Sequence, residues 1–292
     1  MSIAASVVIA TRNRAPYLRD CLHRLAFQST DSRFEVIVAD NGSSDGTAEV
    51  IAQFGPPVRA VYVAQPNRSK ARNAGLAAAA GRIVVFCDDD TLPPSGYVHA
   101  HLRAHALHRN AVVSGPIVNV PDPEHLPPPG AQHYSRAFFC TCNVSVERAQ
   151  LQAIGGFDER YELYGWEDTD VGVRLRRRRL RRVFAKDAYI YHVKPPSAVT
   201  LERRLELARE KGVMAARLVR KWPSLQTRLA TGAYPANFLR AALLRAGPLR
   251  GLYERVARRR AGNSAASALA LEALVDATYV DALRRALRSG DA

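Results

Sequence analysis

The feature that most constrains the fold is a regular alternation of short apolar runs and helical patterns in the first part of the 292-residue chain. The apolar runs and helical patterns follow one another as residues 7–10, 16–27, 34–39, 47–54, 58–63, 69–80 and 83–86. Strands that alternate with helices at this spacing form βαβ units, which join parallel strands by right-handed crossovers. The pattern therefore predicts an α/β fold of the Rossmann-like class, with a mostly parallel sheet flanked by helices.

Acidic residues stand where two of these strands end. Asp40 ends one apolar run, and Asp88, Asp89 and Asp90 follow another. Because such sheets bind ligands at the carboxyl ends of their strands, we expect these carboxylates on one rim. Adjacent carboxylates repel unless a cation or hydrogen-bond donors compensate, and Mg²⁺ and Mn²⁺ prefer such oxygen ligands. The alternatives are a solvated acidic turn for the three aspartates and simple turn organisation for Asp40.

A cationic group is expected at the same rim. Lys70, Arg72 and Asn73 fall in the first turn of the helix predicted over 69–80. Positive side chains at a helix N-terminus oppose the helix dipole, unless an anionic ligand such as phosphate binds there.

A second acidic group lies in the later part of the chain. Glu167 and Asp168 open a predicted helix directly after Trp166. A carboxylate beside an aromatic ring can deprotonate a sugar hydroxyl while the ring stacks on the sugar. The alternative is a simple acidic helix N-terminus, which accounts for one carboxylate. His192 ends a short apolar run, and a lone histidine there is more often structural than a ligand.

The remainder of the chain is less regular until residue 200. Residues 95–109 and 147–154 are expected as helices and residues 111–118 and 138–146 as strands, with a proline-rich loop over 121–129. Beyond residue 200 the composition is rich in Leu, Ala, Arg and Glu, which predicts a helical extension with breaks at Pro223, Pro235 and Pro248. We therefore expect a domain over residues 1–198, with halves 1–118 and 119–198, and a helical extension over 199–292.

The net charge of +15 is concentrated in one window. Residues 171–222 hold 16 basic and 4 acidic side chains. One interpretation is a peripheral surface that meets anionic lipid, or a lipid-linked or acidic glycan acceptor. The other is a solvated helix face whose charges pair at i,i+4 spacing.

The cysteines and the N-terminal pattern predict a cytoplasmic location. The four cysteines, at 21, 87, 140 and 142, match no zinc or extracellular disulfide pattern. The N-terminus runs apolar before basic, the reverse of a signal peptide. No apolar run approaches 18 residues, so no membrane span is expected. Attachment at the inner face of a membrane through the basic window is the open alternative.

Taken together, five segments resemble the inverting family 2 glycosyltransferases with the GT-A fold. The match covers roughly residues 3–195, in order, and its segments are "SVVIATRNRAPYL", "VIVADNGSSDGT", "NRSKARNAGLAAAAG", "FCDDDTLPP" and "CNVSVERAQLQAIGGFDERYELYGWEDTDVGVRLRRR". The last resembles the acceptor segment of galactosyltransferase and chondroitin-synthase-type enzymes. The proline and tyrosine usual around the family's first turn are Ala10 and Arg12 here.

The resemblance implies a role for each candidate residue. The implied nucleotide contacts are Thr11, Asp40, Arg72, Asp88 and Asp89, the metal ligands Asp90 and His192, the acceptor contacts Trp166 and Glu167, and the general base Asp168. The register within the three aspartates is open by one position. The implied cofactor is a divalent metal, Mn²⁺ or Mg²⁺, and the implied donor is a nucleotide-sugar, with a UDP-sugar favoured.

The resulting hypothesis is metal-assisted, inverting sugar transfer to a glycan or lipid-linked acceptor, in polysaccharide or surface-glycan synthesis. A nucleic-acid-binding protein would fit the arginines, but three aspartates on the rim would repel phosphate, so no nucleic acid is expected as a partner. A sugar-nucleotide pyrophosphorylase would share the nucleotide fold, but the first strand lacks a glycine-rich phosphate loop. The same absence disfavours a dinucleotide-dependent oxidoreductase.

Overall fold

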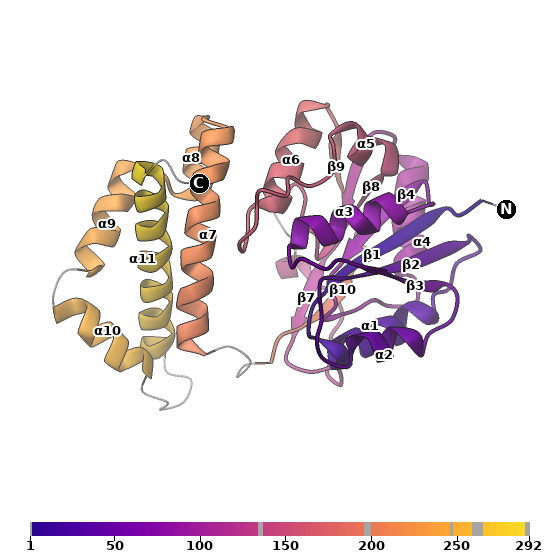
Figure 1. Ribbon diagram of the computed structural model, residues 1–292, viewed down its shortest axis with the longest axis horizontal. Helices are drawn as coiled ribbons and strands as arrows, with labels where there is room; N and C mark the ends of the chain where they lie inside the picture. The colour runs from indigo at the N-terminus through magenta and orange to yellow at the C-terminus, as the bar shows by residue number, and fades with distance from the viewer. Residues whose placement is uncertain (1, 134–136, 196–199, 246–247, 259–264, 290–292) are drawn as a thin grey trace. The chain divides into compact units, whose positions relative to one another are not determined.

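The computed structural model describes residues 2–133, 137–195, 200–245, 248–258 and 265–289 (Figure 1). The chain divides into two compact units. The α/β unit comprises Met1–Glu162 and Glu167–Pro196, and the helical unit comprises Leu163–Trp166 and Ser197–Ala292. The domain boundary predicted between residues 198 and 199 lies outside the described residues.

The α/β unit is built on a mostly parallel sheet, which confirms the predicted fold class. Its described strands run in the order β3-β2-β1-β4-β8-β6-β9. Their bounds are β1 Ala5–Thr11, β2 Phe34–Asp40, β3 Val58–Tyr62, β4 Ile83–Cys87, β6 Ala111–Ser114, β8 Asn143–Glu147 and β9 Arg181–Phe184. The first four strands are parallel, whereas β8 is antiparallel to both β4 and β6. The carboxyl ends of β1, β2 and β4 therefore meet at one edge.

A small second sheet brings a distant strand to that edge. Its order is β5-β10-β7, with bounds β5 Thr91–Leu92, β10 Ile190–Val193 and β7 Ile117–Val120. His192 pairs with Thr91 across the antiparallel ladder, and the Val193 amide donates to the Asp90 carbonyl at 2.9 Å. This pairing places His192 beside the aspartates that follow β4.

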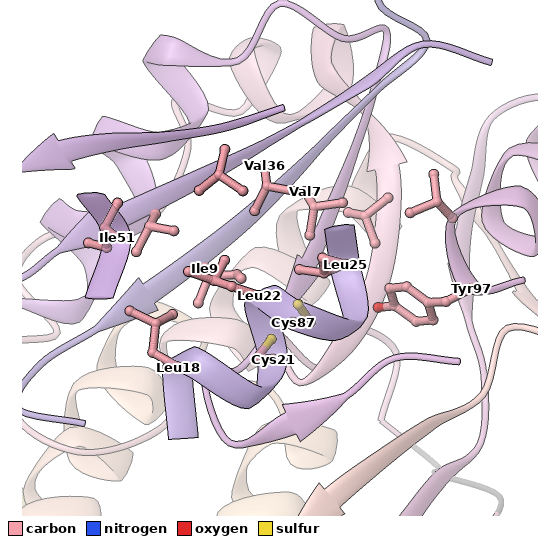
Figure 2. Packing of buried hydrophobic residues seen from close by; sticks show 14 of the residues in the cluster. Val7, Ile9, Leu18, Cys21, Leu22, Leu25, Val36, Ile51, Cys87 and Tyr97 are labelled. Carbon is pink, nitrogen blue, oxygen red and sulfur yellow. The ribbon is translucent and has the colours of Figure 1, made fainter. Parts of the chain in front are cut away.

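Helices cover both faces of the large sheet. Their bounds are α1 Ala15–Ala26, α2 Thr47–Ala52, α3 Arg68–Ala78, α4 Tyr97–Leu107, α5 Arg148–Ala153 and α6 Glu167–Arg177. Alternate strand residues face opposite sides, so that Val7 and Ile9 of β1 pack against Leu18 and Leu22 of α1 (Figure 2). On the other face, strand residues pack with α3, α5 and α6. The two apolar layers give the sheet a buried core on both sides.

One glycine lets a site-bearing helix lie close to the sheet. A Cβ built on Gly75 of α3 would lie 2.5 Å from Val8 Cγ1 of β1. Only a glycine fits this approach without displacement of Val8. The close packing fixes the position of Arg72, which lies one turn earlier on α3.

The helical unit confirms the helices expected beyond residue 200. Its described helices are α7 Leu201–Lys221, α8 Leu225–Thr231, α9 Pro235–Arg245, α10 Pro248–Arg258 and α11 Ala265–Ser289. Pro223 lies between α7 and α8, and Pro235 and Pro248 each begin a helix, where a missing N–H costs nothing. None of the described helices combines the length and the apolar character of a membrane-spanning segment.

Two strand predictions were wrong. Residues 111–118 do not form one strand, because β6 and β7 belong to different sheets and Gly115 and Pro116 separate them. A Cβ on Gly115 would lie 1.8 Å from the Ala188 carbonyl oxygen, so the backbone there packs against another segment. Residues 138–146 form a strand only from Asn143 onward.

Candidate active site

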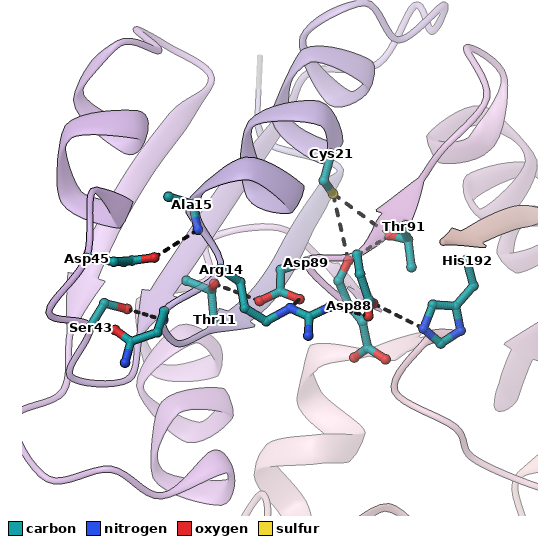
Figure 3. Close-up of polar contacts among 12 residues, drawn as sticks. Thr11, Arg14, Ala15, Cys21, Ser43, Asp45, Asp88, Asp89, Thr91 and His192 are labelled. Atoms are coloured by element: carbon teal, nitrogen blue, oxygen red, sulfur yellow. Dashed lines mark hydrogen bonds and ion pairs between the residues drawn. The ribbon is translucent and has the colours of Figure 1, made fainter. Parts of the chain in front are cut away.

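The aspartates after β4 contact the loop that follows β1. Thr11 Oγ1 donates to Asp89 Oδ2 at 2.7 Å, and Arg14 Nε lies 3.1 Å from Asp89 Oδ1. Figure 3 shows Thr11 and Arg14 around Asp89, with His192 on the opposite side of the aspartates. Burial raises the pKa of Asp89 to about 7, although Arg14 and Thr11 oppose the rise. Asp89 therefore links the segment after β4 to the end of β1 and the loop that follows it. Its predicted contact with the nucleotide stays a prediction.

Asp90 lies between two groups that favour its charged form. Its Oδ2 accepts from Arg14 Nη2 at 2.5 Å, and its Oδ1 lies 3.1 Å from His192 Nε2. Burial works against the carboxylate, but the hydrogen bond and charge of His192 and the charge of Arg14 hold its pKa below the ordinary value. The two predicted metal ligands thus contact each other.

Asp88 belongs to a set of potential metal ligands. One ligand atom each of Asp88, Cys142 and His192 lies within 4.8 Å of the others. Burial and the charge of Asp90 raise the pKa of Asp88, while Arg72 opposes the rise. Burial and Asp88 raise the pKa of Cys142 well above its ordinary value, so without a cation its thiol is protonated.

Asp40 organises the turn after β2. It is 4% exposed, and its Oδ1 accepts from the Ser43 amide at 2.9 Å. Thr11 and Asp40 are partners in the β1–β2 ladder, so both predicted nucleotide contacts end neighbouring strands. The contact with Ser43 is the one expected if Asp40 organises the turn. The contact of Asp40 with a nucleotide stays a prediction.

Arg72 connects the aspartates to the start of α6. Its Nη1 donates to Glu167 Oε1 at 2.8 Å, and its Nη2 lies 3.9 Å from Asp88 Oδ1. Arg72 is 8% exposed. Burial alone would lower its pKa, but Glu167 and Asp88 raise it, so the guanidinium stays charged. One buried cation therefore joins the predicted nucleotide side to the predicted acceptor side.

Asp168 lies in the first turn of α6, with Glu167 before it. Burial and the negative charge of Glu167 raise the pKa of Asp168 to about 6, and Arg72 and the Thr169 amide oppose the rise. Glu167 is 7% exposed, and its Oε2 has no hydrogen-bond partner in the described structure. This oxygen is itself buried, so in this structure it is closed to solvent.

Trp166 belongs to the helical unit and packs on α7. Its Nε1 donates to the Lys211 carbonyl oxygen at 3.0 Å, and Lys211 Nζ lies 5.7 Å from the ring centroid. The Tyr164 amide donates to Glu210 Oε2 at 3.2 Å. The ring is partly buried, and its stacking on an acceptor sugar stays a prediction.

The sequence analysis did not identify Arg14 or Cys142 as site residues. Arg14 precedes α1 at the same rim as the aspartates, and this position was a usable signal. Cys142 lies just before β8, which is antiparallel to β4 at the register Cys87–Asn143. That pairing joins segments 56 positions apart, so no local pattern could reveal it.

Comparison with known proteins gives the family. Residues 6–170 match the family described as Glycosyl transferase family 2. Validoxylamine A glucosyltransferase of Streptomyces hygroscopicus subsp. jinggangensis is 30% identical over 263 residues, which cover 75% of this chain and 61% of that protein. Chondroitin synthase of Escherichia coli is 26% identical over 265 residues, which cover 75% of this chain and 38% of that protein. The chain thus spans less than two thirds of the length of these relatives.

A solved structure supports the fold. Mannosyltransferase PcManGT of Pyrobaculum calidifontis, solved with GDP-Man and Mn²⁺, superposes with a TM-score of 0.64 at 20% identity, over 100% of this chain and 89% of that one. The family match covers more than half of the chain, and the similarity predicted from the five motifs is confirmed. This chain belongs to glycosyl transferase family 2.

Proposed function

We propose that this chain transfers a sugar from a nucleoside-diphosphate donor to an acceptor hydroxyl, with inversion at the anomeric carbon. The observation that carries the proposal is the position of Arg72, which contacts both Asp88 and Glu167. These contacts support the assignment of the aspartates after β4 and the carboxylates of α6 to one site. An inverting single displacement needs this arrangement, with leaving group and base on either side of the sugar.

Donor binding is assigned to the rim formed by β1, β2, α3 and β4. Asp40 and Arg72 are proposed for the base and ribose, and Asp88 for the ribose or metal. Relatives of the same fold are solved with GDP-Man and with UDP-GlcNAc, so both bases are candidates and a UDP-sugar is our first proposal.

The residues present fit a divalent cation. Asp90, which contacts His192, and Asp88, which lies close to His192, offer the carboxylate oxygens that suit Mn²⁺ and Mg²⁺, and His192 adds an imidazole nitrogen. When bound, the cation offsets the negative charge that develops on the departing nucleoside diphosphate. Arg14 contacts Asp89 and Asp90 and holds them at the rim.

Asp168 is proposed as the general base. Its pKa of about 6 leaves it deprotonated at neutral pH and still close to the working pH, where a base is most effective. Glu167, which precedes Asp168 and is held by Arg72, is proposed as an acceptor contact. The acceptor itself is proposed to be a glycan or lipid-linked glycan.

The test combines donor binding with turnover. Thermal shifts with UDP and GDP, with and without Mn²⁺, identify the base and the metal dependence. Asp168→Asn should lower turnover about 10²- to 10⁴-fold and leave donor affinity largely unchanged. Asp31→Asn is the matched control, because Asp31 is exposed before β2, at the opposite edge of the sheet. Loss of donor affinity together with turnover would remove Asp168 from the base role.

A further inference from the structure

A second pocket, of about 370 Å³, lies at the edge of the large sheet opposite the candidate active site. It is formed where β6 and β9 begin, by the segments that follow α4 and α6. Because β8 is antiparallel to both β4 and β6, the strands β4 and β6 run in the same direction, and the start of β6 lies away from the aspartates that follow β4. The volume falls in the range of small-molecule sites, about 300–1,000 Å³.

The pairing of β6 with β9 brings three arginines to this pocket. Arg181 pairs with Ala111 in the parallel ladder, and its amide donates to the Asn110 carbonyl oxygen at 2.9 Å. Arg109 therefore lies near Arg181, although the two are far apart in the sequence. Arg179 comes from the turn that leads from α6 into β9. All three arginines are exposed, and none of their side chains forms an ion pair or a hydrogen bond within the described residues.

Other arginines of the same region have partners inside the protein. Arg174 donates to Asp170 Oδ2 at 2.9 Å, one helical turn earlier on α6. Arg178 donates to Gln150 Oε1 at 3.0 Å. These contacts account for part of the basic window over 171–222 as ordinary structural charge, but they do not account for the arginines at the pocket.

The pocket has an excess of positive charge. Among the described residues, no carboxylate lines it. The carboxyl ends of α4 and α6 lie beside it, and each contributes about half a negative charge, which the three guanidinium groups together exceed. Guanidinium groups present paired N–H donors that match the oxygens of phosphate. A ligand that bears a multiply charged phosphate group would therefore relieve the repulsion among the three cations.

The backbone supports a binding role for Arg179. Its φ is 63°, in the left-handed region just after α6, where the Leu180 amide donates to the Leu175 carbonyl oxygen at 3.3 Å. Glycine is the usual residue at this position of a helix end, because a side chain there is strained. Strained residues cluster at ligand sites. Here the strained residue is the one that supplies a third cation to the pocket.

We propose that this pocket binds a phosphate or diphosphate group through Arg109, Arg179 and Arg181. The pocket is separate from the donor rim, and the inference does not depend on the proposed function. Two sources share this chemistry, a soluble diphosphate and the phosphate of an anionic lipid headgroup. The experiment below separates them.

Titration calorimetry with inorganic pyrophosphate, on metal-stripped protein at low salt, tests the pocket without metal or donor. The wild type should bind, and added salt should weaken the binding. Arg109→Gln and Arg181→Gln should each weaken it about tenfold or more, as loss of one charge-assisted hydrogen bond does. Arg103→Gln is the matched control, because Arg103 lies on α4, pairs with Asp187 and does not line the pocket. It should keep the wild-type affinity.

Arg179→Gly separates binding from folding. Glycine adopts the left-handed backbone without strain, so this variant should keep or raise the wild-type Tm. Its affinity for pyrophosphate should nevertheless fall about tenfold, because one guanidinium group is lost. This variant keeps the test decisive even if a glutamine variant does not fold.

Vesicle sedimentation identifies the source of the phosphate. Vesicles of phosphatidylcholine with phosphatidic acid are compared with vesicles of phosphatidylcholine alone. Sedimentation that needs phosphatidic acid, and that Arg109→Gln reduces more than Arg103→Gln does, supports a lipid headgroup. Pyrophosphate binding without such sedimentation supports a soluble ligand.

Three results would overturn the inference. They are a wild type that binds neither pyrophosphate nor vesicles, pocket variants that keep the wild-type affinity, and an equal loss of affinity in Arg103→Gln. The second result would mean that the three arginines only complement the carboxyl ends of the two helices. The third would mean that the anion responds to overall charge rather than to this pocket.

Discussion

The raised pKa of Asp168 predicts that Asp168→Asn stabilises the protein at neutral pH. The ordinary pKa of 3.8 rises to about 6, because burial and Glu167 disfavour the charged form. A difference of this size corresponds to about 3 kcal/mol between the charged and neutral states. Since Asp168 is only half-buried and solvent weakens the effect, we expect a gain of about 1–3 kcal/mol. An amide avoids the cost of the charge in the folded state.

The gain should depend on pH with a defined sign. Between about pH 4 and 6, the folded protein holds a proton on Asp168 that the unfolded chain has lost, so stability falls as pH rises. Below pH 4 both states are protonated, and the variant and wild type should be similar. Above about pH 6 Asp168 is charged in the folded wild type, so the stability gained by Asp168→Asn should reach its maximum.

Thermal unfolding at pH 4 and pH 8 measures this difference. A gain of about 1–3 kcal/mol raises the Tm by several degrees in a chain of this size. Asp170→Asn is the contrasting control on the same helix, because Asp170 is fully buried and pairs with Arg174 at 2.8 Å. Breaking that pair should lower stability by about 3–5 kcal/mol. An Asp168→Asn variant that is less stable than the wild type at pH 8, or equally shifted at both pH values, would refute the reasoning.

Three other substitutions have defined outcomes. Glu167→Gln removes a negative charge that raises the pKa of Asp168, so the acid limb of the kcat/KM pH profile should move to lower pH; an unchanged or higher limb contradicts this. Trp166→Phe removes the hydrogen bond to Lys211, and thermal denaturation should show a loss of about 1 kcal/mol; unaltered stability would mean that the bond contributes nothing. Gly115→Ala places a methyl group 1.8 Å from the Ala188 carbonyl oxygen, so the variant should lose about 1–3 kcal/mol or more of stability and its Tm should fall. An unchanged Tm would show that the backbone moves to accommodate the methyl group.

The parallel part of the fold could be predicted because its signals are local. Each early strand is a short apolar run, and the polar residues of the rim come directly after these runs. Asp40 and the three aspartates thus fall at the carboxyl edge, where the structure places them. The two incorrect strands lie where pairing is long-range and mixes parallel and antiparallel ladders, and hydrophobic patterns do not encode the partner of a strand.

The individual role of each aspartate could not be predicted from the sequence. Asp89 is buried against Thr11 and Arg14, Asp90 contacts His192, and the Asp88 side chain is the most exposed of the three. Consecutive residues point in different directions, so one run of identical residues meets three environments. Those environments come from the loop after β1 and from β10, which are far apart in the sequence.

The charge balance of the site argues that it needs a cation from outside the chain. The carboxylates that face the site are those of Asp88, Asp90, Glu167 and Asp168, and the guanidinium groups that contact them are those of Arg14 and Arg72. Burial is the main cause of the raised pKa of Asp88 and of Asp168, and the negative charges of Asp90 and Glu167, respectively, add to it. The chain carries a net charge of +15, and yet most of its arginines lie elsewhere. A divalent cation that arrives with a nucleoside diphosphate would bring the missing positive charge only when the donor is bound. The two arginines would then balance only part of the negative charge of the site, and the cation would balance the rest.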